Sequence, residues 1–107
     1  MIELNDKNFN SEISKGFIAV LFYNNFAGPC IEFMPVFEGA EKKYPKMKFA
    51  RLDTDKYPAL AVKYIDVDTE VPTTIFFKNG DEVDRVLGSC SEYALNAKID
   101  DMLVIKK

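Results

Sequence analysis

Histidine and tryptophan are absent from this chain of 107 residues, and cysteine occurs only twice, as Cys30 and Cys90. Without histidine there is no His-assisted serine or cysteine hydrolysis. Two thiols far apart in the sequence are poor material for a zinc site and too few for a disulfide framework. These absences exclude most classes of hydrolase, and we expect no metal site.

Long apolar runs and clusters of positive charge are missing as well. No run of Lys or Arg exceeds two residues and the formal net charge is −3, so we expect no nucleic-acid or membrane partner. The first residues lack the basic and apolar regions of a signal peptide. With 48% hydrophobic and 29% charged residues, the composition suits a globular protein. We expect one domain over residues 1–107, monomeric and cytoplasmic.

Hydrophobic periodicity predicts alternating strands and helices. The run 17–23 contains no charged residue, as expected for a strand that is buried on both faces. Apolar residues at spacings of three and four then predict a helix from Cys30 to Tyr44, which Pro35 should kink. Other strands are predicted at 1–4, 48–53, 73–77 and 81–87, and other helices after Asn5, over 57–64 and towards the C-terminus.

Two short patterns define how the last elements connect. Asn79-Gly80 predicts a two-residue hairpin turn, and Ser89 with Glu92 predicts a capping box for the final helix. The order of elements predicts an α/β fold in three layers, with a mixed β-sheet between two layers of helices.

One stretch carries the candidate chemistry, Asn24-Asn25-Phe26-Ala27-Gly28-Pro29-Cys30, between the buried strand and the long helix. A cysteine at a helix N-terminus faces unpaired N–H groups and the positive end of the helix dipole, which favour the thiolate. Taken alone, Cys30 is better explained by burial, because free cysteine packs as a small hydrophobic residue and this one lies on the apolar face of the predicted helix.

The stretch Phe26-Ala27-Gly28-Pro29-Cys30 resembles the active-site motif of the thioredoxin family, Trp-Cys-Gly-Pro-Cys. The resemblance extends over nearly the whole chain, through Pro35, 52–55, Val71-Pro72-Thr73, 76–80 and Gly88. It implies the thioredoxin fold, which has the order of strands and helices predicted above.

The resemblance also implies roles for two positions. In the family, the first cysteine attacks a substrate disulfide and the second resolves the mixed disulfide. The nucleophile belongs at Ala27 and the resolving thiol is Cys30, so the chain as written lacks the two-thiol cycle. The family needs no bound cofactor, acts on protein disulfides and is reduced by a thioredoxin reductase.

A docking surface is implied as well. In the family the proline at Pro72 follows a cis peptide bond and lies against the active-site turn. It removes a backbone donor where another chain approaches, and the preceding residue can pair with an extended substrate. The implied apolar surface comprises Phe26, Gly28, Pro29, Val71, Pro72 and Gly88. Cys90 follows this glycine, and we expect it to be a packed thiol.

Three positions depart from the family pattern. Leu21 stands where the family usually has a buried aspartate that helps to deprotonate the resolving thiol, and Phe26 replaces tryptophan. Ala27 has two possible origins, substitution in an active parent or natural loss. The leading hypothesis is a protein-disulfide oxidoreductase inactivated at Ala27. The alternative is a non-redox module that binds proteins at the cis-proline surface.

Overall fold

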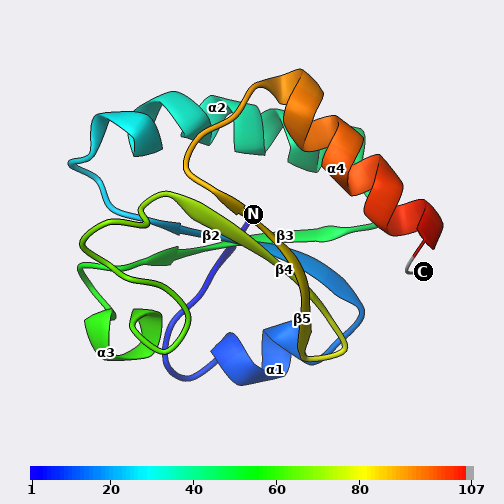
Figure 1. Cartoon of the computed structure of the whole chain (residues 1–107). Helices are drawn as coiled ribbons and strands as arrows, with labels where there is room; N and C mark the ends of the chain where they lie inside the picture. The colour runs from blue at the N-terminus through cyan, green and yellow to red at the C-terminus, as the bar shows by residue number, and fades with distance from the viewer. Residues whose placement is uncertain (106–107) are drawn as a thin grey trace.

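A five-stranded sheet forms the centre of the computed structural model, which describes residues 1–105 (Figure 1). The strands lie in the order β1-β3-β2-β4-β5. β1 pairs with β3 and β3 with β2 in parallel, whereas β4 pairs antiparallel with both β2 and β5. The predicted mixed sheet is therefore confirmed. The strands are β1 (Ile2–Glu3), β2 (Phe17–Tyr23), β3 (Lys48–Asp53), β4 (Thr73–Lys78) and β5 (Asp81–Leu87).

Helices cover both faces of the sheet, as predicted (Figure 1). α2 (Gly28–Lys43) and α4 (Glu92–Ile105) lie on one face, and α1 (Phe9–Ile13) and α3 (Pro58–Ala61) on the other. Between residues 1 and 105, none of these helices has the length and apolar character needed to cross a bilayer.

The two short helices are shorter than the sequence predicts. Asn5 Oδ1 accepts hydrogen bonds from the N–H groups of Lys7 and Asn8, at 2.8 and 2.9 Å, and so caps a turn. α1 begins only after that turn, at Phe9. After Ala61 the N–H groups of residues 63 and 64 bond to carbonyls three residues back, which ends α3 in a tighter turn.

β2 is the most deeply buried strand. Its residues 18–22 have no exposed surface. Ala19, Leu21 and Tyr23 pack into the cluster beneath α2 and α4, whereas Ile18 and Phe22 pack into the cluster on the α1 and α3 side. The prediction of a strand with two apolar faces is confirmed.

The hairpin prediction is also confirmed, but the capping box is wrong. Asn79 and Gly80 have φ angles of 50° and 91°, as the two-residue turn between β4 and β5 requires. The helix cap is Ser91, whose Oγ accepts a hydrogen bond from the Ala94 N–H at 3.1 Å. Ser89 lies two residues before this cap. The preceding Gly88 donates its N–H to the Pro72 carbonyl at 2.8 Å, and residues 89 and 90 connect Gly88 to the capping residue.

Phe37 provides a test of the core beneath α2. Its ring is fully buried and lies 5.4 Å from the ring of Phe49 on β3. We expect Phe37→Ala to lower the free energy of unfolding by about 3–5 kcal/mol, through lost burial and the cavity left behind. Tyr93→Ala, at an 84% exposed ring, should change it by less than about 0.5 kcal/mol. Urea unfolding followed by circular dichroism measures both, and equal effects would contradict this assignment of the core.

Candidate functional site

The turn between β2 and α2 is organised by the side chain of Asn24. Its Oδ1 accepts hydrogen bonds from the N–H groups of Phe26 and Ala27, at 2.9 and 2.7 Å. Ala27 has an extended conformation and precedes the first helical residue, and its carbonyl accepts from the N–H groups of Cys30 and Ile31 at 3.1 and 3.2 Å. Position 27 is therefore the N-cap of a sixteen-residue helix.

Pro29 contributes to the same start. It occupies the first turn of α2, where its missing N–H would have no intrahelical partner and its fixed φ suits the helix. Gly28 and Pro29 are both exposed, and Phe26 is 84% exposed just before them. The turn thus presents its apolar residues outward while the helix carries Cys30 inward.

Cys30 lies inside the protein. Only 1% of its surface is exposed, and it packs in the cluster with Phe33 and Phe37. Burial raises the pKa of the Cys30 thiol, and a backbone hydrogen bond with Asn24 offsets part of that rise. Both cysteines are free thiols, and burial raises the pKa of Cys90 as well, with Lys98 acting in the opposite direction.

Leu21 fills the core where the resemblance implies a carboxylate. It is fully buried in the same cluster as Cys30. Its register partner on β3 is Arg51, which forms an ion pair with Glu3. The Arg51 guanidinium also lies 5.4 Å from the centre of the Tyr23 ring. Glu3 and the Tyr23 ring therefore position the Arg51 side chain, and no buried aspartate in the described part of the chain takes part.

A cleft of about 280 Å³ lies beside the turn, lined among others by Asn25, Cys30, Met34, Glu38 and Arg51. Arg51 Nη1 donates a weak hydrogen bond to Met34 Sδ at 3.7 Å on one wall. Apolar side chains, amides, the Glu38 carboxylate and a paired guanidinium line this cleft next to Cys30. Among residues 1–105 no carboxylate is buried beside the thiol, and Leu21 fills the core there.

The second segment of the site is the start of β4. The Val71–Pro72 peptide bond is cis, Pro72 is buried and Val71 is half-buried. Gly88 donates its N–H to the Pro72 carbonyl with a φ of 76°, a left-handed conformation that favours glycine. Ala27, Val71 and Cys90 pack against the same buried cluster, which links the three segments.

Sequence reasoning missed the role of Asn24 and the partner of Arg51. Asparagine side chains often bond to the backbone two or three residues on, and an asparagine just before a turn is the signal for Asn24. Glu3 carries no such signal, because its approach to Arg51 depends on the pairing of β1 with β3.

The acidic residues of the loops serve local structure. Asp53 Oδ1 accepts from the N–H groups of Asp55 and Lys56, and Asp66 Oδ1 from that of Asp68. Among the described residues, no group of three or more His, Cys, Asp or Glu side chains is placed to hold a metal ion.

Comparison with known proteins agrees with this geometry. The family model for thioredoxin matches residues 1–101. A thioredoxin of Chlamydia caviae is 38% identical over 82 residues, which cover 77% of this chain and 78% of the relative. A thioredoxin structure from Plasmodium falciparum superimposes with a TM-score of 0.82 and 30% identity, covering 94% of this chain and 98% of that one. The thioredoxin structure of Fasciola hepatica gives 0.80 and 32%, with the same coverage.

The family match and the fold thus indicate a thiol-disulfide oxidoreductase kind of protein. The chain belongs to the thioredoxin family.

The burial of Cys30 predicts low thiol reactivity at neutral pH. Because its pKa is raised, the thiolate fraction at pH 7 is below that of a free thiol, and reactivity should rise only at alkaline pH. Cys30 should also react more slowly than the half-buried Cys90. Iodoacetamide labelling of the Cys30→Ser and Cys90→Ser variants, folded and in urea, measures each thiol separately. A folded Cys30 that reacts as fast as the unfolded thiol would contradict this.

Proposed function

We propose that this chain has the scaffold of a protein-disulfide oxidoreductase and lacks only the attacking sulfur, because alanine stands at position 27, where the nucleophilic cysteine would be. The observation that carries the proposal is the Asn24-held turn, which keeps position 27 at the N-cap of α2. As written, the chain runs no dithiol exchange, because Cys30 has no partner thiol at that position.

A thiol at position 27 would be well placed for attack. The position is half-exposed, and it lies at the N-terminus of a long helix, whose dipole stabilises negative charge. Its thiolate would attack one sulfur of a substrate disulfide and release the other as a thiolate, which takes up a proton. Cys30, one turn along α2, would then lose its proton and attack the mixed disulfide, which forms a disulfide between positions 27 and 30 and releases the second substrate sulfur as a thiol.

The second step would be slow in this protein. Cys30 must lose its proton to attack, its pKa is raised by burial, and Leu21 occupies the place of the usual proton acceptor. A variant with a thiol restored at position 27 would therefore favour formation of a mixed disulfide over its resolution.

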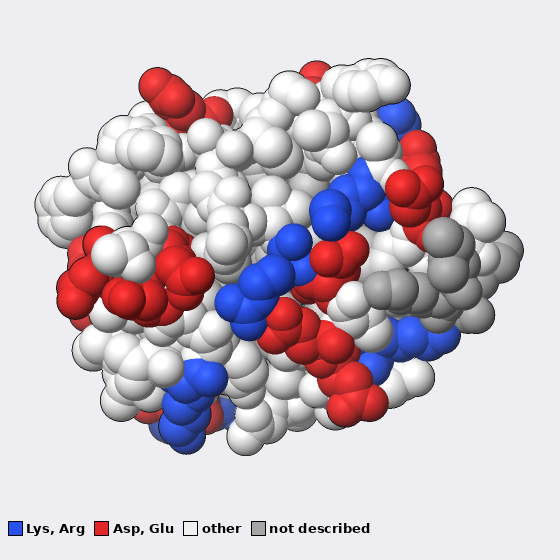
Figure 2. Space-filling model, in the orientation of Figure 1, with Lys and Arg blue, Asp and Glu red and all other residues white. Residues whose placement is uncertain are grey.

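The proposed docking surface is the apolar set defined above, Phe26, Gly28, Pro29, Val71, Pro72 and Gly88. The exposed Phe26 ring supplies apolar contact area. Figure 2 supports an uncharged surface, since few charged side chains lie over the upper left of that face, where Figure 1 places α2 and the segment that leads into α4. The backbone of Val71 would pair with an extended polypeptide.

The partners proposed are proteins with accessible disulfides and, for a restored enzyme, a thioredoxin reductase. The cytoplasm is the proposed location, because reducing systems act there and keep thiols reduced. No cofactor takes part, since both reacting sulfurs would belong to the polypeptide.

A second candidate function is a module that binds extended polypeptides without redox chemistry. Leu21 and Cys30, both inside the apolar core, favour it. The two candidates differ in what position 27 contributes. An oxidoreductase regains activity when sulfur is restored there, whereas a binding module gains nothing.

Restoring the nucleophile tests the leading proposal. We expect Ala27→Cys to reduce insulin disulfides faster than the dithiothreitol background, whereas the chain with Ala27 stays at background. Insulin turbidity measures the rate. In the Ala27→Cys background, Cys30→Ser should abolish turnover and accumulate the mixed disulfide, which mass spectrometry detects.

Two results would decide against the proposal. One is an Ala27→Cys variant that is folded by circular dichroism, forms a disulfide between the introduced thiol and Cys30, and yet reduces no insulin. The other is equal activity of Ala27→Cys with and without Cys30. Either result would leave the binding module as the better account.

A further inference from the structure

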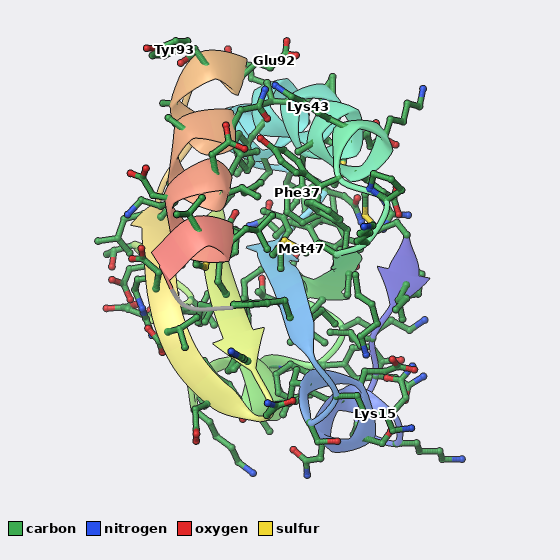
Figure 3. The ribbon with its side chains drawn as sticks, turned by 90° about the vertical axis from the view of Figure 1, so that its right-hand side faces the viewer. Lys15, Phe37, Lys43, Met47, Glu92 and Tyr93 are labelled. Carbon is green, nitrogen blue, oxygen red and sulfur yellow. The ribbon has the colours of Figure 1, made fainter. Side chains whose placement is uncertain are left out.

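An apolar cleft of about 330 Å³ lies at the end of the molecule where β2 begins, and we name it the Phe17 cleft. Its walls are the side chains of Phe17, Tyr44, Pro45, Met47 and Leu103. They come from the start of β2, the segment after α2 and the last turns of α4. Figure 3 looks onto this end, with Lys43 above Met47 at the end of α2.

Ammonium groups surround this apolar cleft. Lys43 and Lys46 belong to its lining and are exposed. Within residues 1–105 neither is paired with a carboxylate. A third ammonium, that of Lys78, lies 5.0 Å from the centre of the Phe17 ring. In a chain of net charge −3, Lys43 and Lys46 thus place two ammonium groups at the mouth of an apolar cleft, where they can attract an anion.

The polar group of Tyr44 is directed to α4. Its hydroxyl donates to Asp100 Oδ1 at 2.6 Å and lies 3.2 Å from the Asn96 carbonyl. Burial of the hydroxyl, this hydrogen bond and the charge of Asp100 raise the pKa of Tyr44 to about 12. A ligand in the cleft would therefore meet the Tyr44 ring and the lysines, whereas the hydroxyl is already bonded.

We propose that the Phe17 cleft binds a small anion with an apolar body, namely a medium-chain carboxylate of the fatty-acid class. The tail would lie against Phe17, Met47 and Leu103, where burial of apolar surface favours binding. The carboxylate would lie at the mouth near Lys43 and Lys46. The volume lies at the small end of the range for ligand sites, which suits a single chain and not a larger cofactor.

This site is separate from the proposed oxidoreductase site. The active-site turn follows the last residue of β2 and the cleft is built on its first, so seven residues, roughly 20 Å of strand, separate them. Binding at the Phe17 cleft therefore needs neither Cys30 nor the cis-proline surface. Its test can fail or succeed without changing the proposed function.

Decanoate, with decanol as the uncharged analogue, provides the test. Each compound is titrated into the ¹⁵N-labelled chain. We expect decanoate to shift the amide resonances of Phe17, Met47 and Leu103 saturably and to leave the resonances of Phe26 and Ala27 unchanged. Decanol should bind more weakly. The double variant Lys43→Gln, Lys46→Gln should weaken decanoate about 2- to 30-fold, the effect of losing two exposed ion pairs.

The control is Lys42→Gln with Lys7→Gln, which removes the same charge at exposed positions outside the cleft. It should leave decanoate affinity unchanged. Decanoate shifts that do not saturate, decanol binding as tight as decanoate, or equal losses in the two double variants would each overturn the proposal. Matching spectra of variants and parent away from the cleft establish that the fold is intact.

Discussion

Burial of both faces of β2 is the constraint on which the other elements depend. A strand without a charged residue needs an apolar cover on each side, so Leu21 and its neighbours bring α2 and α4 to one face, and Phe22 and its neighbours bring α1 and α3 to the other. The chain leaves this fixed strand at Tyr23 and must enter α2 at once. Asn24 closes that short connection with two backbone hydrogen bonds, and position 27 therefore has a defined place at the helix N-terminus.

The same burial explains why the fold around the turn is stable although the groups that assist thiol chemistry are not in place. Leu21 packs in the core at no electrostatic cost, whereas a carboxylate there would be desolvated and would need a partner. The protein thus has an apolar core under α2 and lacks the proton acceptor that the family usually has there. Cys30 retains its place on α2 but has a raised pKa. The bonds from Phe26 and Ala27 to the Asn24 side chain, together with the backbone bonds to the Ala27 carbonyl, hold the turn, so the geometry of the site does not depend on a sulfur at position 27.

Residues whose roles are local could be predicted from the sequence, and those whose roles depend on distant contacts could not. The uncharged run 17–23 and Asn79-Gly80 carry their own structural signal, and both predictions are confirmed. The capping box at Ser89 failed because Ser91 caps α4 instead, while the preceding Gly88 is bonded to Pro72, a residue distant in the sequence. The pairing of Arg51 with Glu3 needs the β1–β3 register, which no local pattern contains.

Both candidate functions require that the proposed docking surface binds polypeptide without the nucleophile, and binding of a chain that has no thiol to exchange tests this most directly. The probe is S-carboxymethylated insulin B chain, titrated into the ¹⁵N-labelled protein under reducing conditions. The account predicts saturable shifts at Phe26, Val71 and Gly88, unchanged by Cys30→Ser and lost in Val71→Asp, while the exposed control Val62→Asp leaves them in place. Absence of saturable shifts at these residues, or shifts that require Cys30, would contradict it.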